Sequence, residues 1–493
     1  MPPSSRGSGS PDDNHRAVAF GGLLMVLSRA VALPLGLVLS VFLARSLGPE
    51  AFGVYTVAMS IVGWAQSTTF MLINRPAILL VAEAEDWEAA GSTIAQLQLA
   101  LGALVAGLLF VAAPHLGGSE GGSGMTTVLR ILALGIPLSA LGTAHNSVIE
   151  GRRWFQRSAQ YIVVSVVTDF GLAVALVALG WGAVGAAWAS VLAALVQWVF
   201  AATVLRLRWW RRLRPPNRAF LQDATPLLLD GLVKRLNKRV DLWAVQGLSG
   251  ATAAGQYSVA LSFTSVSQVF SHTLASVVLA TVANAWTTGQ RETGRRIIRQ
   301  VLRLTLFLTP FAALGAGAAQ PLVSLLFGPA YDAAAPVLAW IAFSIVADIL
   351  ISVTAGALAA IGHPGAALAF SGPALVLSLA GFVWLVPRHG AAAAAAVSTV
   401  LGWTASLGAM LAIRHWSGAG PSRATLLRVG LISAIGFAAA RLWQVPGPWV
   451  VGQLLALCAV VTALLFLTGE ATRKDIQFAL SLVRRPRQRQ AGD

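Results

Sequence analysis

The chain has 493 residues, of which 56% are hydrophobic and only 11% are charged, and its mean hydropathy is +0.72. Soluble domains carry roughly a quarter charged residues, so this composition excludes a soluble globular protein as well as a disordered one. The apolar residues come in blocks of about 20, the length that a helix needs to cross a bilayer. The sequence therefore predicts an all-α, polytopic membrane protein.

The apolar blocks predict about 14 transmembrane helices. Their expected ranges, in chain order, are 22–44, 53–74, 92–115, 127–148, 158–180, 183–205, 222–247, 254–280, 303–326, 335–360, 366–387, 390–413, 427–444 and 447–469. The polar residues 1–16 are expected to form a disordered cytoplasmic tail, and residues 471–493 a basic cytoplasmic tail.

The formal net charge of +16 is unevenly spread, because the arginines gather in alternate loops between the expected helices. Residues 206–218 and 291–303 are the densest examples. Loops rich in Lys and Arg stay in the cytoplasm, so this pattern places both chain ends inside the cell. Topology thus accounts for the positive charge, and we expect no nucleic-acid partner.

Residues 47–60 and 249–262 form an internal repeat, identical at seven of 14 positions without a gap. Their separation of 202 residues covers six expected helices. This spacing predicts two parallel six-helix lobes related by an axis along the membrane normal, as in many transporters. We expect the N-lobe within residues 17–215, the C-lobe within 216–415, and two further helices within 416–470.

The seventh expected helix is unusual in its charge. It contains six ionisable residues, which are Asp230, Lys234, Arg235, Lys238, Arg239 and Asp241. An ionisable group at bilayer depth costs at least about 2.5–3.5 kcal/mol, so such groups normally face a cavity or a partner. Four cations against two acids indicate a basic cavity that binds an anion. The alternative is an amphipathic helix over residues 228–241 on the cytoplasmic surface.

Other charges also fall within expected helices. Arg29 in the first helix aligns with Gly231 by the repeat offset, and Arg75 closes the second helix, where an interfacial arginine is the alternative. Asp169 and Asp348 are single acids in apolar runs. Together with Asp230 and Asp241, these two acids are candidates for counter-ions to the cations or for sites of a coupling ion. We expect no catalytic residues and no metal site.

Four segments resemble the polysaccharide-transporter and oligosaccharide-flippase families of the multidrug/oligosaccharidyl-lipid/polysaccharide exporter superfamily. In chain order they are LARSLGPEAFGVYTVAMSIVG (43–63), NSVIEGRRWF (146–155), KRVDLWAVQGLSGATAAGQYSVAL (238–261) and PLVSLLFGPAYDAAAPVL (321–338). The resemblance implies that the protein is a flippase and not an enzyme. It would move a polyprenyl-(pyro)phosphate-linked oligosaccharide, a polysaccharide or cell-wall precursor, from the inner to the outer leaflet by alternating access.

By the same resemblance, the pyrophosphate or acidic sugars would bind to the cavity cations, namely Arg29, Arg75, Lys234, Arg235, Lys238 and Arg239. The implied partners are the lipid-linked glycan, the lipids of the cell membrane, and glycosyltransferases or a polymerase of the same pathway. We expect no cofactor, while coupling to Na⁺, H⁺ or the membrane potential stays open.

Two other functions compete with this reading. A cation-coupled multidrug exporter of the same superfamily would use carboxylates for Na⁺ or H⁺ and keep few cavity cations. A membrane glycan polymerase or glycosyltransferase would need paired acids or a large domain outside the membrane, and the only adjacent aspartates, Asp12 and Asp13, lie in the N-terminal tail.

Overall fold

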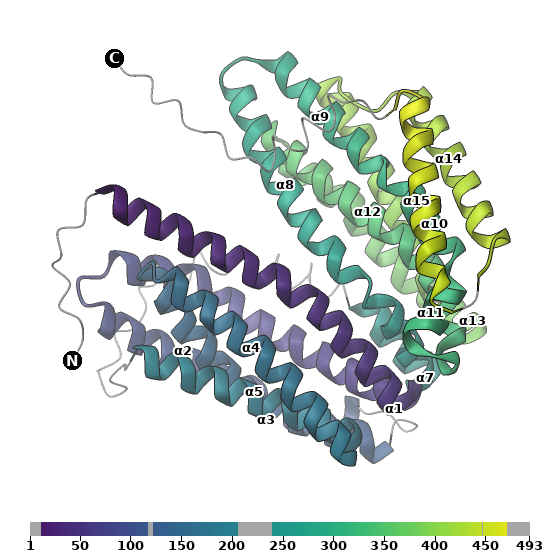
Figure 1. Ribbon diagram of the computed structural model, residues 1–493. Helices are drawn as coiled ribbons and strands as arrows, with labels where there is room; N and C mark the ends of the chain where they lie inside the picture. The colour runs from purple at the N-terminus through teal and green to yellow at the C-terminus, as the bar shows by residue number, and fades with distance from the viewer. Residues whose placement is uncertain (1–10, 117–121, 206–238, 446, 471–493) are drawn as a thin grey trace. The chain divides into compact units, whose positions relative to one another are not determined.

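The computed structural model describes residues 11–116, 122–205, 239–445 and 447–470, and within some helices it describes the backbone alone. Every regular element in these ranges is helical (Figure 1). Contacts divide the chain into an N-terminal unit, Met1–Gly255, and a C-terminal unit, Gln256–Asp493. The lobe boundary expected at residue 215 lies outside the described residues.

The N-terminal unit is a bundle of long apolar helices. They are α1 (Pro11–Glu83), α2 (Trp87–Leu116), α3 (Gly122–Gly151), α4 (Phe155–Leu176), the π-helix η1 (Val177–Trp181) and α5 (Gly182–Leu205), followed by the start of α7 (Val240–Leu261). α3 lies at the centre, because it packs against α1, α2 and α5. Ile73, Ile94, Leu141 and Val148 form the core where α1, α2 and α3 meet. Helices with apolar residues all round suit a bilayer.

The C-terminal unit contains the remaining helices. They are α8 (Thr264–Thr287), α9 (Arg291–Leu306), α10 (Leu308–Gly317), α11 (Ala319–Phe327), the 3₁₀ helix η2 (Pro329–Ala334), α12 (Ala335–Ala360), α13 (Pro364–Ser417), α14 (Arg423–Leu442) and α15 (Trp449–Leu467). α12 is central and packs against α8, α10 and α13. A core cluster that includes Val282, Leu302 and Leu350 joins α8, α9 and α12.

Within the described residues, nine helical stretches are long and apolar enough to cross a membrane. This confirms a polytopic membrane protein. Three of the stretches contain a break where two expected helices meet: Pro34–Ser67 at Gly48, Phe155–Leu205 at Gly180 and Gly182, and Gly372–Ser417 at Gly390. The seventh expected helix falls largely on residues 206–238, outside the described range. The number of 14 helices therefore stays a prediction.

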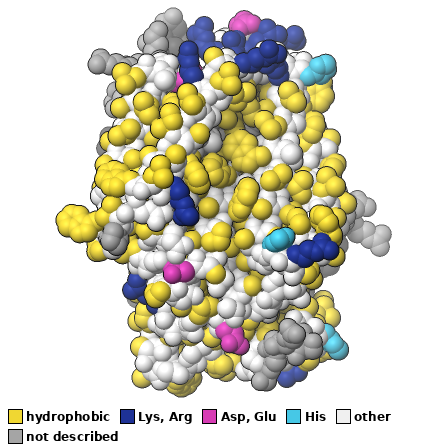
Figure 2. Space-filling view, turned by 90° about the vertical axis from the view of Figure 1, so that its right-hand side faces the viewer, with side chains coloured by type: hydrophobic (Ala, Val, Ile, Leu, Met, Phe, Trp, Pro, Cys, Tyr) yellow, Lys and Arg dark blue, Asp and Glu magenta, His cyan; other side chains and the backbone are white. Residues whose placement is uncertain are grey.

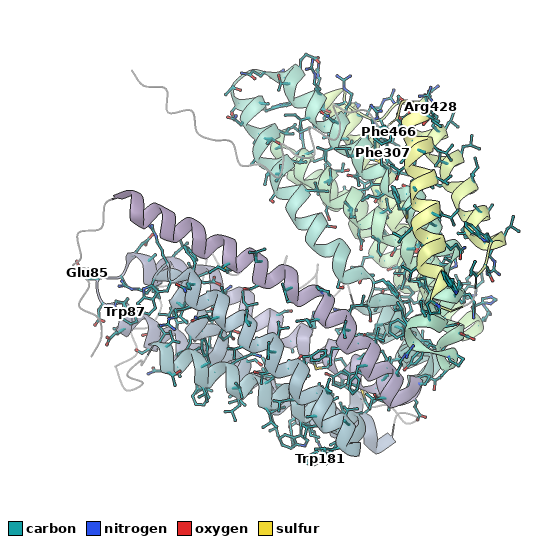
Figure 3. All side chains as sticks on the ribbon, in the orientation of Figure 1. Glu85, Trp87, Trp181, Phe307, Arg428 and Phe466 are labelled. Carbon is teal, nitrogen blue, oxygen red and sulfur yellow. The ribbon has the colours of Figure 1, made fainter. Side chains whose placement is uncertain are left out.

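Glycines form the corners between these helices, and two of the corners match across the internal repeat. Gly48 has φ 76° and ψ 170°, and Gly250, 202 residues later, has φ 82° and ψ 179°. This backbone region is essentially restricted to glycine. The two similar sequences thus adopt the same local conformation. Along the N-terminal unit, Glu85 and Trp87 lie at one end and Trp181, in the η1 corner, lies at the other (Figure 3).

A second pair of repeat glycines makes a close helix crossing within the N-terminal unit. A Cβ atom built on Gly53 of α1 would overlap the carbonyl oxygen of Ala251 in α7, and one built on Gly255 would overlap the carbonyl oxygen of Pro49. The two contacts are equivalent under the repeat, since Gly53 and Gly255 are 202 positions apart and so are Pro49 and Ala251. The crossing is therefore locally symmetric, and its backbones approach too closely for a larger residue.

A basic surface lies at one end of the C-terminal unit. Figure 2 shows Lys and Arg side chains gathered at this end, above a broad hydrophobic surface. The amphipathic helix α9 contributes to it: Arg291, Arg296 and Arg299 are exposed, whereas Ile298 and Leu302 are buried. α9 lies in one of the arginine-rich segments that are expected in the cytoplasm, where such residues stay in contact with water and lipid headgroups.

Candidate functional site

The structure describes only part of the predicted basic site. Asp230, Lys234, Arg235 and Lys238 lie outside the described residues. The backbones of Arg29 and Arg75 belong to α1, and their side chains are outside the described set. These six assignments stay predictions.

The end of the charged segment is described, and it is anchored within the N-terminal unit. Arg239 is exposed in the turn before α7, and Asp241 lies in the first turn, where its Oδ1 accepts a hydrogen bond of 2.7 Å from the backbone N–H of Leu242. Trp243 Nε1 donates a hydrogen bond of 2.8 Å to Ser60 Oγ of α1. The Trp243 ring also contacts Trp64 edge to face, with centroids 5.8 Å apart.

The two single acids of the apolar runs have different surroundings. Asp348 is exposed on α12, although its neighbours Ala347 and Ile349 are buried. Asp169 of α4 is partly buried and lines a cavity in the N-terminal unit. Both acids were predicted as counter-ions or coupling sites, with Asp348 favoured for coupling because it falls in the middle of its expected helix, and the structure gives them different surroundings.

The cavity has a volume of about 610 Å³, is partly open, and is lined by residues of α1 to α5. Part of its wall is apolar and includes Leu35, Leu39, Met59 and Phe170. Hydroxyl and amide groups supply most of the polar wall, whose members are Gln66, Ser67, Gln98, Ser139, Thr143, Ser165, Asp169, Ser190 and Gln197. Among the described lining residues Asp169 is the only charged one, and none is basic.

Hydrogen bonds hold several of these polar groups in place. Ser190 Oγ lies 3.3 Å from the hydroxyl of buried Tyr55 and donates a hydrogen bond of 3.4 Å to the backbone carbonyl of Ala186. On the opposite wall, Gln66 Nε2 donates to Ser139 Oγ at 3.3 Å. These contacts orient side chains that would otherwise sample several rotamers.

Gln98 is the exception in this cavity. Its side chain is 1% exposed, yet neither its amide nitrogen nor its amide oxygen has a hydrogen-bond partner in the structure. A buried polar group without a partner costs about 1–3 kcal/mol. A partner from outside the protein, either water or a ligand, would remove this cost.

Of the polar lining residues, only Asp169 was predicted as a site from the sequence. A signal was present in the spacing of polar residues within apolar helices. Ser139 and Thr143 are four residues apart, as are Ser165 and Asp169, and this spacing places each pair on one helix face. That the faces turn toward one cavity is a property of the bundle.

Taken together, the apolar helices and the internal repeat define a multi-pass helical membrane protein with a polar cavity. A family model described as "Polysaccharide biosynthesis protein" matches residues 42–336, and the chain belongs to this family. The chain is also 28% identical over 358 residues to the succinoglycan biosynthesis transport protein ExoT of Rhizobium meliloti (strain 1021). That alignment covers 68% of this chain and 67% of ExoT.

Solved structures show the same fold. The lipid II flippase MurJ in an inward closed conformation matches with a TM-score of 0.75 at 14% identity, covering 94% of this chain and 100% of that one. An inward-facing multidrug resistance MATE family transporter of the MOP superfamily matches with a TM-score of 0.62 at 16% identity, covering 83% and 99%. The family match confirms the predicted resemblance to polysaccharide transporters, and these two structures show that the fold is shared.

Proposed function

We propose that this protein moves a polyprenyl-(pyro)phosphate-linked oligosaccharide from the inner to the outer leaflet of the cell membrane. The supporting observation combines the family and the structure. The chain belongs to a polysaccharide biosynthesis family, and its described residues form helices that are long and apolar enough to cross a membrane. The names of two relatives agree with this role, since MurJ is a lipid II flippase and ExoT a succinoglycan transport protein.

The proposed mechanism is alternating access of the two lobes around a basic central cavity. The pyrophosphate of the substrate would bind Lys and Arg side chains, which form strong charge-assisted hydrogen bonds with phosphate oxygens. The proposed set is Arg29, Arg75, Lys234, Arg235, Lys238 and Arg239. The described end of this set supports the assignment, because Arg239 is exposed in the turn before α7, whose Trp243 is hydrogen-bonded to Ser60 of α1.

The acids have separate proposed roles. Asp230 and Asp241 lie on the charged segment and serve as counter-ions that reduce the cost of placing four cations together. Asp348, exposed on the apolar helix α12, is the proposed site for a coupling Na⁺ or H⁺, with the membrane potential as the alternative energy source. Glycosyltransferases or a polymerase of the same pathway would supply the substrate and use the product.

A paired substitution tests the basic site. The substrate is a fluorescently labelled undecaprenyl-pyrophosphate-linked oligosaccharide in proteoliposomes. Its transfer between leaflets is measured by adding a quencher that reaches only the label in the outer leaflet. We expect Lys234→Gln with Lys238→Gln to lower the transfer rate at least about tenfold, because each charge-assisted bond is worth roughly 1.5–3 kcal/mol.

The matched control is Arg291→Gln with Arg296→Gln, which changes the net charge equally on the exposed face of α9. We expect this variant to transfer substrate at the wild-type rate. A wild-type rate in the Lys234 and Lys238 variant, at equal reconstitution, would refute the assignment of these cations.

A second candidate function is cation-coupled export of small organic cations. The structural match to a multidrug transporter and the acid in a polar cavity favour it. Export of a cationic dye from vesicles, with no transfer of the labelled glycolipid, would select this function over the first.

A further inference from the structure

We infer that the cavity lined by helices α1 to α5 binds sugar rings of the transported glycan. We further infer that it accepts neutral sugars and excludes acidic ones. The inference rests on the proposed function for its assumption that the cargo is a glycan. It places the sugar at a site separate from the cations that would bind the pyrophosphate. Size, polar chemistry, charge and apolar surface each support it.

The size of the cavity fits a small organic group. Pockets for such ligands measure about 300–1,000 Å³, and this one measures about 610 Å³. A single bound ion would leave most of that space unfilled. The cavity therefore suits one or two sugar rings better than a lone cation.

The polar wall matches the chemistry of sugar hydroxyls. Each sugar hydroxyl both donates and accepts hydrogen bonds, so it pairs best with groups that offer both functions. Side-chain amides and hydroxyls do so, and the wall presents them at Gln66, Gln98, Ser139 and Gln197. Gln98 lines the cavity with both of its amide atoms buried and unpartnered, so a rotation of its side chain would bring a donor and an acceptor to adjacent hydroxyls.

The charge of the wall selects against acids. Asp169 lines this wall, and its carboxyl oxygens can accept hydrogen bonds from sugar hydroxyls. A uronic acid here would bring a carboxylate to a wall in which no described lining side chain is basic. Such a buried, unpaired charge is strongly disfavoured. Amino sugars, by contrast, would be tolerated.

The remaining wall is apolar and suits the C–H faces of sugar rings. Phe170 directly follows Asp169 on α4, and Met59 and Leu39 approach from α1. A ring could thus have polar contacts at its edge and apolar contacts on its faces, the usual division of a ligand pocket.

The test measures sugar binding directly, without transfer. In full-length protein carrying Cys458→Ser, the substitution Ser165→Cys places one thiol in the cavity wall, and its rate of alkylation by a small water-soluble reagent is recorded. The probes are cellobiose and its analogue in which one glucose is replaced by glucuronic acid. Cellobiose at about twice its dissociation constant should slow alkylation about threefold, since only empty cavities react. The acidic analogue should have no effect at the same concentration.

Two substitutions separate binding from folding. Gln98→Leu should weaken cellobiose protection about 3- to 10-fold, the effect of one or two lost hydrogen bonds, while raising the melting temperature because an unpartnered buried amide is removed. Asp169→Asn should retain cellobiose protection and leave the acidic analogue excluded, because no described lining side chain is basic in either variant. The control thiol is Thr287→Cys, exposed at the end of α8 in the other unit, which cellobiose should not protect.

Several results would overturn the inference. One is that cellobiose does not protect the thiol, and another is that the acidic analogue protects the wild-type cavity equally well. A third is slower alkylation in NaCl than in choline chloride without any sugar, which would indicate a site for a small cation. The proposed function fails separately: absence of glycolipid transfer, with cellobiose protection intact, would reject the flippase and leave a sugar site. Normal transfer without protection would reject the sugar site alone.

Discussion

At the residue scale, single glycines decide how closely helices approach in this protein. The crossing of Gly53 and Gly255 brings the backbones of α1 and α7 into direct contact, with no room for a Cβ atom on either side. The same two positions match in the internal repeat, so the sequence identity at these sites has a steric cause.

Replacing Gly53 with alanine tests this crossing. We expect Gly53→Ala to lower the free energy of unfolding by about 1–3 kcal/mol, because the added methyl group forces the two helices apart. Thermal unfolding of the detergent-solubilised protein measures the change. The control is Gly107→Ala in α2, where the new methyl group meets no atom within 4 Å and alanine favours the helix. A melting temperature for Gly53→Ala as high as that of the control would contradict the tight crossing.

At the scale of elements, one buried acid joins three helices of the C-terminal unit. Glu470 follows α15, and its side chain is 4% exposed. It pairs with Arg303 of α9 at 3.2 Å and with Arg428 of α14 at 3.0 Å, and it accepts a hydrogen bond from Thr425 Oγ1 at 3.0 Å. Arg428 lies at the same end of the unit as Phe307 and Phe466 (Figure 3).

Neutralising this acid should loosen the end of the bundle. We expect Glu470→Gln to reduce stability by about 2–3 kcal/mol, because two arginines lose their buried partner. The effect is smaller than for a fully buried pair, since the Arg303 and Arg428 side chains are 29% and 50% exposed. The control is Glu292→Gln, whose carboxylate is 75% exposed and pairs with Arg295 at 2.7 Å, and which should change stability by less than about 1 kcal/mol. Equal melting temperatures for the two variants would show that burial of Glu470 has no energetic role.

At the scale of the whole molecule, the distribution of arginines predicts that both chain ends lie in the cytoplasm. A fluorescent protein fused after Asp493 should therefore fluoresce, because it folds in the cytoplasm. Alkaline phosphatase inserted at Gly118, in an expected outside loop, should be active. The reverse pattern would reject both the orientation and the even number of helices.

Much of the architecture was predictable because it depends on local properties of the chain. The length of the apolar blocks predicts membrane helices, and the glycines at 48, 250 and 390 fall where two expected helices meet. The repeat was visible as sequence identity because both copies need the same glycine corner and the same close crossing. These features involve neighbouring residues, or pairs that match directly.

The cavity could not be predicted in the same way, because its wall is assembled from five helices between residues 32 and 197. Each helix contributes one or two polar residues, and each of these alone resembles an ordinary polar residue in a membrane helix. Likewise, Glu470 is a single acid at the end of a helix until folding brings Arg303 and Arg428 to it. The sequence by itself determined the class of protein, its helices and its repeat, since hydropathy and glycine act locally. Only the tertiary structure decided which polar groups meet, because that depends on which faces of distant helices pack together.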